Sequence, residues 1–433
     1  MARMRWRAKW GGVVGAIVWL ATAPGCEGAG GRGTDAGEGG GEEGDSAGED
    51  EATGEGDAED GEAEVEASPT PCERVTEATV ETVALLAAGR YAPAAAILEG
   101  GGALIAGGYE FERGAQRSAE VFDGATGTLL ATGNLRQARN FPATAVTRGG
   151  EVLVFGGFHP SFGSDNKVEI YDPAAGSFRF GGNAMGVGRE AHTATLLPDG
   201  RVLVAGGLQA IGFEFHSSAE IYDPAAESFV ATAAPMNAPR AFHAAALLAS
   251  GEAVLVVGGD SGSGELATAE RYVLADGSFW NVPVALAHAA KAPAVAGLPD
   301  GTVLVAGGAN ATDGTLADAT VYDEAGDRFE PVAPMAVRRM AHTLTALADG
   351  RVLAAGGWSD TEVPSASTGA LEVFDPESAS WTTLPVRLER PRHDHVALLL
   401  PDCRVLVAGG QSVVSGGVPV APLELEIVTV PAR

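Results

Sequence analysis

Short apolar runs that end in two glycines recur along this chain at intervals of about 50 residues. An unbroken apolar run of this length, bounded by glycine, predicts a strand that is buried on both faces. A constant spacing of this size predicts a repeat protein, in which each unit buries its apolar face against the next. The runs are ALIAGG, VLVFGG, VLVAGG, VLVVGG, VLVAGG, VLAAGG and VLVAGG, and their doublets begin at Gly107, Gly156, Gly206, Gly258, Gly307, Gly356 and Gly409.

The rest of each repeat predicts three more strands. A stretch such as AHTATLL (191–197) precedes the glycine run, and Pro198-Asp199-Gly200 joins the two in the manner of a hairpin turn. Downstream, stretches such as VEIYDP (168–173) alternate in polarity, and a large apolar residue such as Phe178 begins a fourth strand. Four antiparallel strands per repeat, with no helical periodicity between them, indicate the blade of a β-propeller.

The repeat resembles the kelch repeat. The shared features are the doublet-ending strand, Tyr-Asp-Pro, an aromatic residue and an Arg-x-x-His strand, and they cover residues 78–430. We interpret these motif residues as scaffold. The fourth repeat departs most from the pattern, since Tyr272-Val273-Leu274 stands where the others have Tyr-Asp-Pro.

Counting strands predicts how the ring closes. The last doublet is followed by LELEIVTV (423–430), a third strand, and then the sequence ends without a fourth. TVETVAL (79–85) precedes Arg90 at the spacing that a fourth strand has before the next repeat. We therefore predict an all-β, seven-bladed kelch-type propeller whose last blade is completed by the N-terminal strand, which removes open sheet edges.

The first 70 residues have a different composition. Residues 1–26 combine a positive segment with the apolar stretch GGVVGAIVWLA, as signal peptides do. They end in Ala23-Pro24-Gly25-Cys26, which resembles a bacterial lipoprotein box and implies lipidation of Cys26; the alternative is ordinary cleavage after Ala23. Residues 27–70 are mostly Gly, Ala, Glu and Asp, which predicts a disordered acidic linker ahead of a propeller at 71–433.

Charge and export narrow the class of function. The formal net charge of −29 argues against nucleic acid as a partner. We expect a monomer in the cell envelope, at the outer membrane or cell surface, that touches the membrane only through its lipid; a secreted protein is the alternative. The resemblance is to kelch-containing envelope lipoproteins of bacteria.

One arginine position is repeated in six units. It lies 17 residues before the doublet, with one extra residue in the fourth unit, and the fifth unit has Ala290 instead. We expect this position near the propeller axis, on the face that carries the loops after the doublets. In kelch domains this face binds acidic protein segments, so the resemblance implies a binding role; the alternative is a structural ring of arginine–carboxylate pairs. The candidate binding residues are Arg90, Arg139, Arg189, Arg240, Arg339, Arg392, Tyr109, Phe158, Phe213 and Trp358.

Two classes of function remain open. The first is a non-catalytic binding module for a protein, an acidic ligand or a carbohydrate, with no cofactor. The second is a carbohydrate-active enzyme that resembles sialic-acid mutarotases or, with less support, galactose oxidase, because only Tyr91 and Tyr109 lie outside the strand motif. Histidine alternates with proline three residues after the arginine, which indicates packing, and no metal-binding motif is evident.

Two cysteines remain after Cys26. An exported chain with exactly two thiols favours a disulfide between them. Cys403 stands in the first hairpin of the seventh blade, and Cys72 precedes the strand that enters that blade from the same side. We predict that Cys72 and Cys403 form a bond at the seam where the chain ends meet; the alternative is two unpaired thiols.

Overall fold

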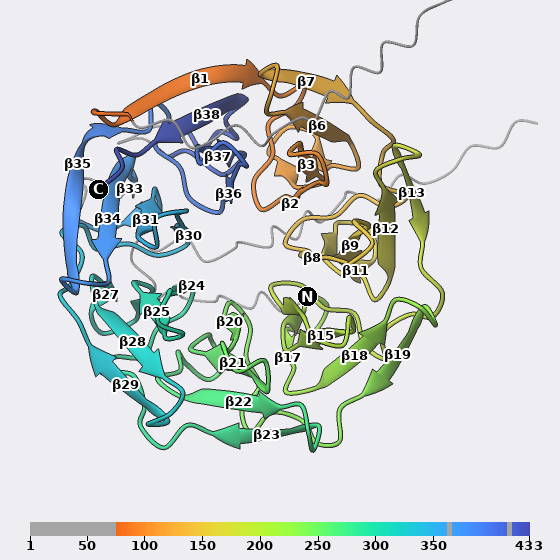
Figure 1. Ribbon diagram of the computed structural model, residues 1–433. Coiled ribbons are helices and arrows are strands. Elements are labelled where there is room, and N and C mark those ends of the chain that lie inside the picture. The colour runs from red at the N-terminus through yellow and green to blue at the C-terminus, as the bar shows by residue number, and fades with distance from the viewer. Residues whose placement is uncertain (1–74, 362–365, 414–417) are drawn as a thin grey trace, which may run out of the picture. The chain divides into compact units, whose positions relative to one another are not determined.

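Seven four-stranded antiparallel sheets form a ring in the computed structural model (Figure 1). The structure describes residues 75–361, 366–413 and 418–433, and these contain strands and turns but no helix. The predicted signal peptide (1–26), the linker (27–70), Cys26 and Cys72 lie outside the described residues. The all-β, seven-bladed prediction is confirmed.

We number the blades by the order of their doublets. Blades 1 to 3 contain β2 (Ala94–Ile97), β3 (Ala103–Ala106), β6 (Ala119–Asp123) and β7 (Thr128–Ala131); β8 (Ala143–Val146), β9 (Val152–Phe155), β12 (Val168–Asp172) and β13 (Ser177–Phe180); and β14 (Thr193–Leu196), β15 (Val202–Ala205), β18 (Ala219–Asp223) and β19 (Ser228–Ala231).

The other four blades follow the same order. They contain β20 (Ala244–Leu247), β21 (Ala253–Val257), β22 (Ala269–Val273) and β23 (Ser278–Asn281); β24 (Ala294–Gly297), β25 (Val303–Ala306), β28 (Ala319–Asp323) and β29 (Arg328–Pro331); β30 (Thr343–Ala346), β31 (Val352–Ala355), β34 (Ala370–Asp375) and β35 (Ser380–Arg387); and β36 (Val396–Leu399), β37 (Val405–Ala408), β38 (Glu424–Thr429) and β1 (Thr79–Leu85).

Blade 7 closes the ring with strands from both ends of the chain. β1 pairs antiparallel with β38 from Thr79↔Thr429 to Leu85↔Glu424, and Figure 1 shows the two strands side by side. The predicted closure is therefore confirmed. Cys403 lies in the first turn of this blade, at the place where other blades have a turn glycine, and like them it has positive φ (+69°).

The core lies between neighbouring blades. Every residue of β9 is buried, because alternate side chains pack on opposite faces. Val152 and Val154 pack toward blade 1, whereas Leu153 and Phe155 pack against Val202, Val204 and Tyr222 of blade 3. The same arrangement recurs around the ring, so each blade needs both neighbours to bury its second strand.

The glycine doublets allow the blades to approach one another at the axis. In all seven blades the N–H of the second glycine donates to the backbone carbonyl of the residue at the arginine position of the next blade, at 2.8 to 2.9 Å. A Cβ on the first glycine would lie only 2.3 to 2.7 Å from that carbonyl oxygen. Since any side chain would collide there, the doublets are required by blade packing.

The Tyr-Asp-Pro motif also serves the scaffold. The Tyr171 and Phe178 rings form a cross-strand pair with centroids 4.8 Å apart. The Asp172 carboxylate accepts backbone N–H bonds from Ala174 and Ala175, which fixes the turn into the fourth strand.

Candidate functional site

The repeated arginines form buried ion pairs. Each of the six side chains has 0% exposure, donates to the carbonyl of the first doublet glycine of its own blade, and pairs with a glutamate from the third strand. The pairs are Arg90–Glu120 (3.0 Å), Arg139–Glu169 (2.7 Å), Arg189–Glu220 (2.9 Å), Arg240–Glu270 (2.6 Å), Arg339–Glu372 (2.5 Å) and Arg392–Glu426.

The glutamates connect the arginines to the chain that enters each blade. The Glu372 carboxylate, for example, also accepts the backbone N–H groups of Ala336 and Val337. Burial lowers the pKa of Arg339, and the Glu372 carboxylate opposes this shift. These guanidinium groups are therefore enclosed and paired, which is the structural alternative that the sequence left open; a ligand-binding role for them stays a prediction, and this geometry does not favour it.

Blade 5 lacks both members of the pair. Ala290 stands at the arginine position, and Thr320 stands where the third strand otherwise has glutamate. The Ala290 carbonyl still accepts the N–H of Gly259, so the backbone contact between blades is preserved. At the surface of this blade, the His288 imidazole instead pairs with the Asp318 carboxylate.

A second ring of hydrogen bonds surrounds the axis. Two residues after the arginine position, each blade has a non-glycine residue with φ between 48° and 54°, whose N–H donates to the same residue of the preceding blade at 2.8 to 3.2 Å. We call these residues the axial ring: Ala92, Phe141, Ala191, Phe242, Ala292, Ala341 and Asp394. Because their backbone groups bond to one another, their side chains determine what the axis offers to a ligand.

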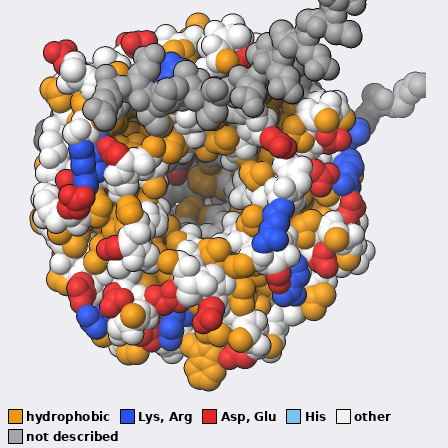
Figure 2. Space-filling model, viewed as in Figure 1, with side chains coloured by type: hydrophobic (Ala, Val, Ile, Leu, Met, Phe, Trp, Pro, Cys, Tyr) orange, Lys and Arg blue, Asp and Glu red, His pale blue; other side chains and the backbone are white. Residues whose placement is uncertain are grey.

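A cavity of about 220 Å³ lies at the axis. We call it the axial cavity; axial-ring residues of blades 2 to 7 line it, together with His192, His243 and His342. Figure 2 shows the hollow at the centre of the ring with hydrophobic side chains around it. Asp394 is the one ionisable residue of the axial ring, and burial raises the pKa of its carboxyl to about 7.

The histidines that line the cavity also pack between neighbouring blades. The first doublet glycine of the preceding blade has room for the His192 ring only because it lacks a Cβ. Burial lowers the pKa of His192 and His342 well below the usual value, and neither ring has a hydrogen-bond partner among the described residues. The His243 Nε2 atom lies 2.9 Å from the Thr193 hydroxyl.

The residue directly after the arginine position varies most between blades. It forms a β-bridge with the residue after the doublet, which places it on the face that carries the hairpins following the doublets, here called the loop face. These positions are Tyr91, Asn140, Glu190, Ala241, Lys291, Met340 and His393. Burial raises the pKa of Glu190 to about 8, and burial together with the nearby Asp394 carboxylate raises that of Tyr91.

Short hairpins extend from the loop face. They are β4 (Tyr109–Glu110) with β5 (Gly114–Ala115), β10 (Phe158–His159) with β11 (Gly163–Ser164), β16 (Leu208–Gln209) with β17 (Glu214–Phe215), β26 (Ala309–Asn310) with β27 (Gly314–Thr315), and β32 (Trp358–Ser359) with β33 (Ala366–Ser367).

The hairpins of blades 1 to 3 expose large apolar side chains. We call this set the apolar crescent: Phe111 (43% exposed), Phe162 (44%), Ile211 (65%) and Phe213 (57%). Phe213 has φ +52°, an unfavourable conformation for a bulky residue. The hairpins of blades 2 and 3 are joined, because the Ser164 hydroxyl accepts the N–H of Ala210 at 2.9 Å.

A continuous set of aromatic rings connects the crescent to the axial cavity. Ring centroids are 5.4 Å apart for Phe111 and Tyr91, 5.4 Å for Tyr91 and Tyr109, 6.0 Å for Tyr91 and Phe141, and 6.0 Å for Phe141 and Phe242. The surface hairpin of blade 1 and the axis are therefore linked by contacts between aromatic rings.

The aromatic residues predicted from the sequence differ in accessibility. Phe213 is exposed, Tyr109 and Phe158 are half-buried, and Trp358 is only 4% exposed, edge-on to His393. Four further residues of this region, Phe141, Phe242, Glu190 and Asp394, were not among the candidates predicted from the sequence. For Glu190 the available signal was the variation in residue type directly after a constant arginine; the other three stand one residue further along.

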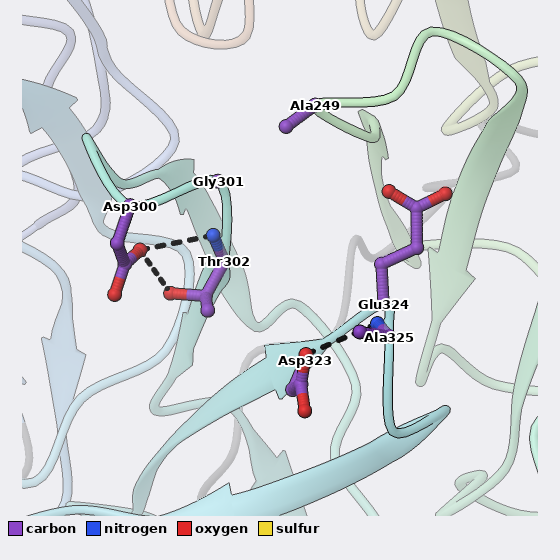
Figure 3. A pocket seen from close by; sticks show the side chains of 7 residues that line it. All are labelled: Ala249, Asp300, Gly301, Thr302, Asp323, Glu324 and Ala325. Atoms are coloured by element: carbon purple, nitrogen blue, oxygen red, sulfur yellow. Dashed lines mark hydrogen bonds between the residues drawn. The ribbon is translucent and has the colours of Figure 1, made fainter.

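A second hollow, of about 330 Å³, lies between turns of blades 4 and 5 (Figure 3). Its carboxylates are engaged in turn contacts: Asp300 accepts from Thr302, Asp323 accepts from Ala325, and Glu324 accepts from the Ser250 hydroxyl at 2.6 Å. This hollow offers no unpartnered group that indicates a ligand.

Comparison with known proteins gives a fold and no family. No protein-family model matches the chain, and no curated protein matches it, so the kelch and lipoprotein resemblances stay predictions. A solved structure described as a novel fungal alcohol oxidase of the AA5 family, in complex with copper, is similar with a TM-score of 0.61 and 17% identity. The match covers 81% of this chain and 75% of the other. At this identity it shows the propeller fold alone.

The described residues do not fit a copper centre. They contain no group of three or more His, Cys, Asp or Glu side chains that could hold a metal ion. His393, next to Tyr91 around the axis, has its Nδ1 atom 2.9 Å from the Ser367 hydroxyl.

In the part of the chain that the structure describes, no helix is long and apolar enough to cross a membrane.

Proposed function

We propose that this protein is a binding module whose loop face, at the apolar crescent and the adjoining axis, receives a ligand or partner. The observation that carries this proposal is the exposed Phe213, held at φ +52° on a hairpin that is fastened to its neighbour. Unfavourable backbone conformations cluster where function maintains them, and grouped exposed apolar side chains mark interaction sites. The arginines contribute by holding the hairpins in place.

The test compares two exposed aromatic sites. The full chain carrying Phe111→Ser and Phe213→Gly is expected to lose at least nine-tenths of partner capture from an envelope extract, with its fold unchanged, because glycine also relieves the backbone at 213. Trp280→Ser, on the outer strand of blade 4 and 56% exposed, is the matched control and should capture normally. Equal capture by all three proteins would refute the site.

The enzymatic alternative has a separate test. A mutarotase acting on a sugar carboxylate needs accessible cations, and the six arginines are enclosed. The AA5 neighbour motivates the oxidase alternative through its fold only. Copper analysis of the purified protein, with a screen for sialic-acid anomerisation, distinguishes these activities from binding; stoichiometric copper or turnover would replace our proposal with an enzyme.

We also propose that the module is displayed at the cell envelope by a lipid on Cys26, with the acidic segment 27–70 as a tether and a Cys72–Cys403 disulfide at the closure seam. The leader, the composition and the position of Cys403 support this. Cys26→Ser should release the protein from membranes, and the denatured, unreduced variant should titrate without thiols. Continued membrane association, or two titratable thiols, would contradict the anchor or the disulfide respectively.

A further inference from the structure

Asp394 differs from the other members of the axial ring. Four of them are alanine and two are phenylalanine, whereas Asp394 brings a carboxylate to the axis. Its carboxylate has no hydrogen-bond partner among the described residues, and the nearest imidazole nitrogen, His393 Nε2, is 3.8 Å away. Its side chain is 27% exposed and lines the cavity, so a cation that enters the cavity can reach the carboxylate.

Two neutral histidines and an aromatic ring also line the cavity. His192 and His342 line it, each is 7% exposed, and both ring nitrogens of each lack a partner among the described residues. The nitrogens themselves are buried, and burial keeps both imidazoles neutral, so they add no positive charge that would repel a cation. Phe242 of blade 4 lies three blades from Asp394, which places an aromatic ring across the axis from the carboxylate.

We propose that the axial cavity binds an organic ammonium group. An alkylammonium carries donors and no acceptor, which matches the acceptor-only Asp394 carboxylate, and the neutral imidazoles do not repel its charge. Its charge is also attracted to aromatic rings such as Phe141 and Phe242. An anion would meet the Asp394 carboxylate with no accessible guanidinium to compensate it, since the arginines are fully buried and paired. A metal ion lacks a suitable ligand group among the described residues.

Size and access agree with this ligand. A volume of about 220 Å³ equals roughly seven water molecules at about 30 Å³ each, enough for an ammonium with a short alkyl stem. The aromatic rings from Phe111 to Phe242 supply an apolar path for that stem. The inference rests on the proposed function and gives its ligand chemistry: a free amine or the lysine side chain of a partner.

The test is a calorimetric titration of the full chain with n-butylammonium at about pH 8.5, above the raised pKa of about 7 of the Asp394 carboxyl, so that this group is ionised. Asp394→Asn removes the charge but keeps the shape, and asparagine tolerates left-handed backbone well. We expect at least tenfold weaker binding in Asp394→Asn and a smaller loss in Phe242→Leu. Asp276→Asn, at an exposed turn, is the matched control and should bind as the unaltered chain does. The acidic segment is identical in all four proteins, so the differences report the cavity.

Two results would overturn the proposal. One is equal affinity of the unaltered chain and Asp394→Asn, which would place the amine elsewhere. The other is equal binding of n-butanol, which would mean that the cavity recognises only the alkyl chain. Should Asp394→Asn fail to fold, Phe242→Leu and the butanol comparison decide the matter.

A capped lysine, acetyl-lysine methylamide, separates the two sources of the ammonium. Binding of n-butylammonium and the capped lysine, both dependent on Asp394, supports a general amine site, and binding of the lysine alone supports a partner's side chain. Amine binding combined with unchanged capture by the Phe111→Ser and Phe213→Gly chain would uphold the cavity and refute the proposed function. Loss of capture by that chain, combined with no amine binding by the unaltered chain, would uphold the proposed function and refute the cavity as an amine site.

Discussion

Blade 5 and the other six blades pack around the axis in the same way but with different side chains at the arginine and glutamate positions. Six blades bury an arginine with a glutamate, whereas blade 5 has Ala290 and Thr320. Both kinds of blade make the same backbone contacts at the axis, including Gly259 N–H to the Ala290 carbonyl at 2.8 Å. The ion pair is therefore a unit, present or absent as a whole, and a blade can pack into the ring without it.

This comparison separates scaffold from site. If the arginines served a ligand, the loss of one would not require the loss of its glutamate. Their joint absence is expected when a buried charge is tolerated only together with its partner. The positions that vary between blades stand directly after the arginine, on the loop face, and one residue further along, in the axial ring. Function is therefore expected there.

The largest effect should come from breaking one pair. Arg339→Ala leaves the Glu372 carboxylate buried and deprived of its cation, and removal of one partner of such a pair typically costs about 3–5 kcal/mol. Urea unfolding should show a correspondingly lower midpoint. The control is the double variant Arg339→Met with Glu372→Gln, which removes both charges while the Gln carbonyl can still accept the N–H groups of Ala336 and Val337, and it should unfold closer to the unaltered chain. Equal loss in both would mean that the charges themselves stabilise the blade.

A smaller and more informative effect should come from transplanting the pair into blade 5. Ala290→Arg alone introduces an unpaired buried cation and should destabilise the protein. Adding Thr320→Glu should recover part of that loss, because the carboxylate would stand where the other blades have it. The coupling energy from the double-mutant cycle should favour the pair by about 0.5–3 kcal/mol. A coupling of zero would show that blade 5 has lost the geometry as well as the residues.

The sequence predicted the scaffold well because the scaffold is periodic. The doublets, the Asp-Gly turns and the missing last strand each follow from local rules, and the closure by β1 was confirmed. The ion pair could also be predicted from the sequence, since Glu recurs at one position of the third strand, as in Glu169 two residues before Tyr171. It is missing only in the fifth repeat, the repeat that also lacks the arginine.

The axial cavity could not be predicted in the same way. Phe141, Phe242 and Asp394 are separated by 100 residues or more and meet only because the ring closes. Their shared left-handed backbone has no sequence signature, since alanine, phenylalanine and aspartate all adopt it here. The exposure of the aromatic side chains on the hairpins could not be predicted either, because it depends on how each loop folds over its neighbour.

The smallest effect should come from the surface pair that blade 5 has in place of the buried one. The Asp318 carboxylate raises the pKa of His288 above its ordinary value of about 6.5. A histidine whose pKa is raised by folding stabilises the protein fully below its unfolded pKa, and loses that contribution as pH rises through the folded pKa. Both side chains are about half exposed, so solvent screening limits the pair to about 0.2–1 kcal/mol. His288→Ala should therefore lower the urea midpoint slightly at pH 5.5 and not at pH 9. A pH-independent difference would mean that His288 acts through packing and that blade 5 has no ionic substitute for the missing pair.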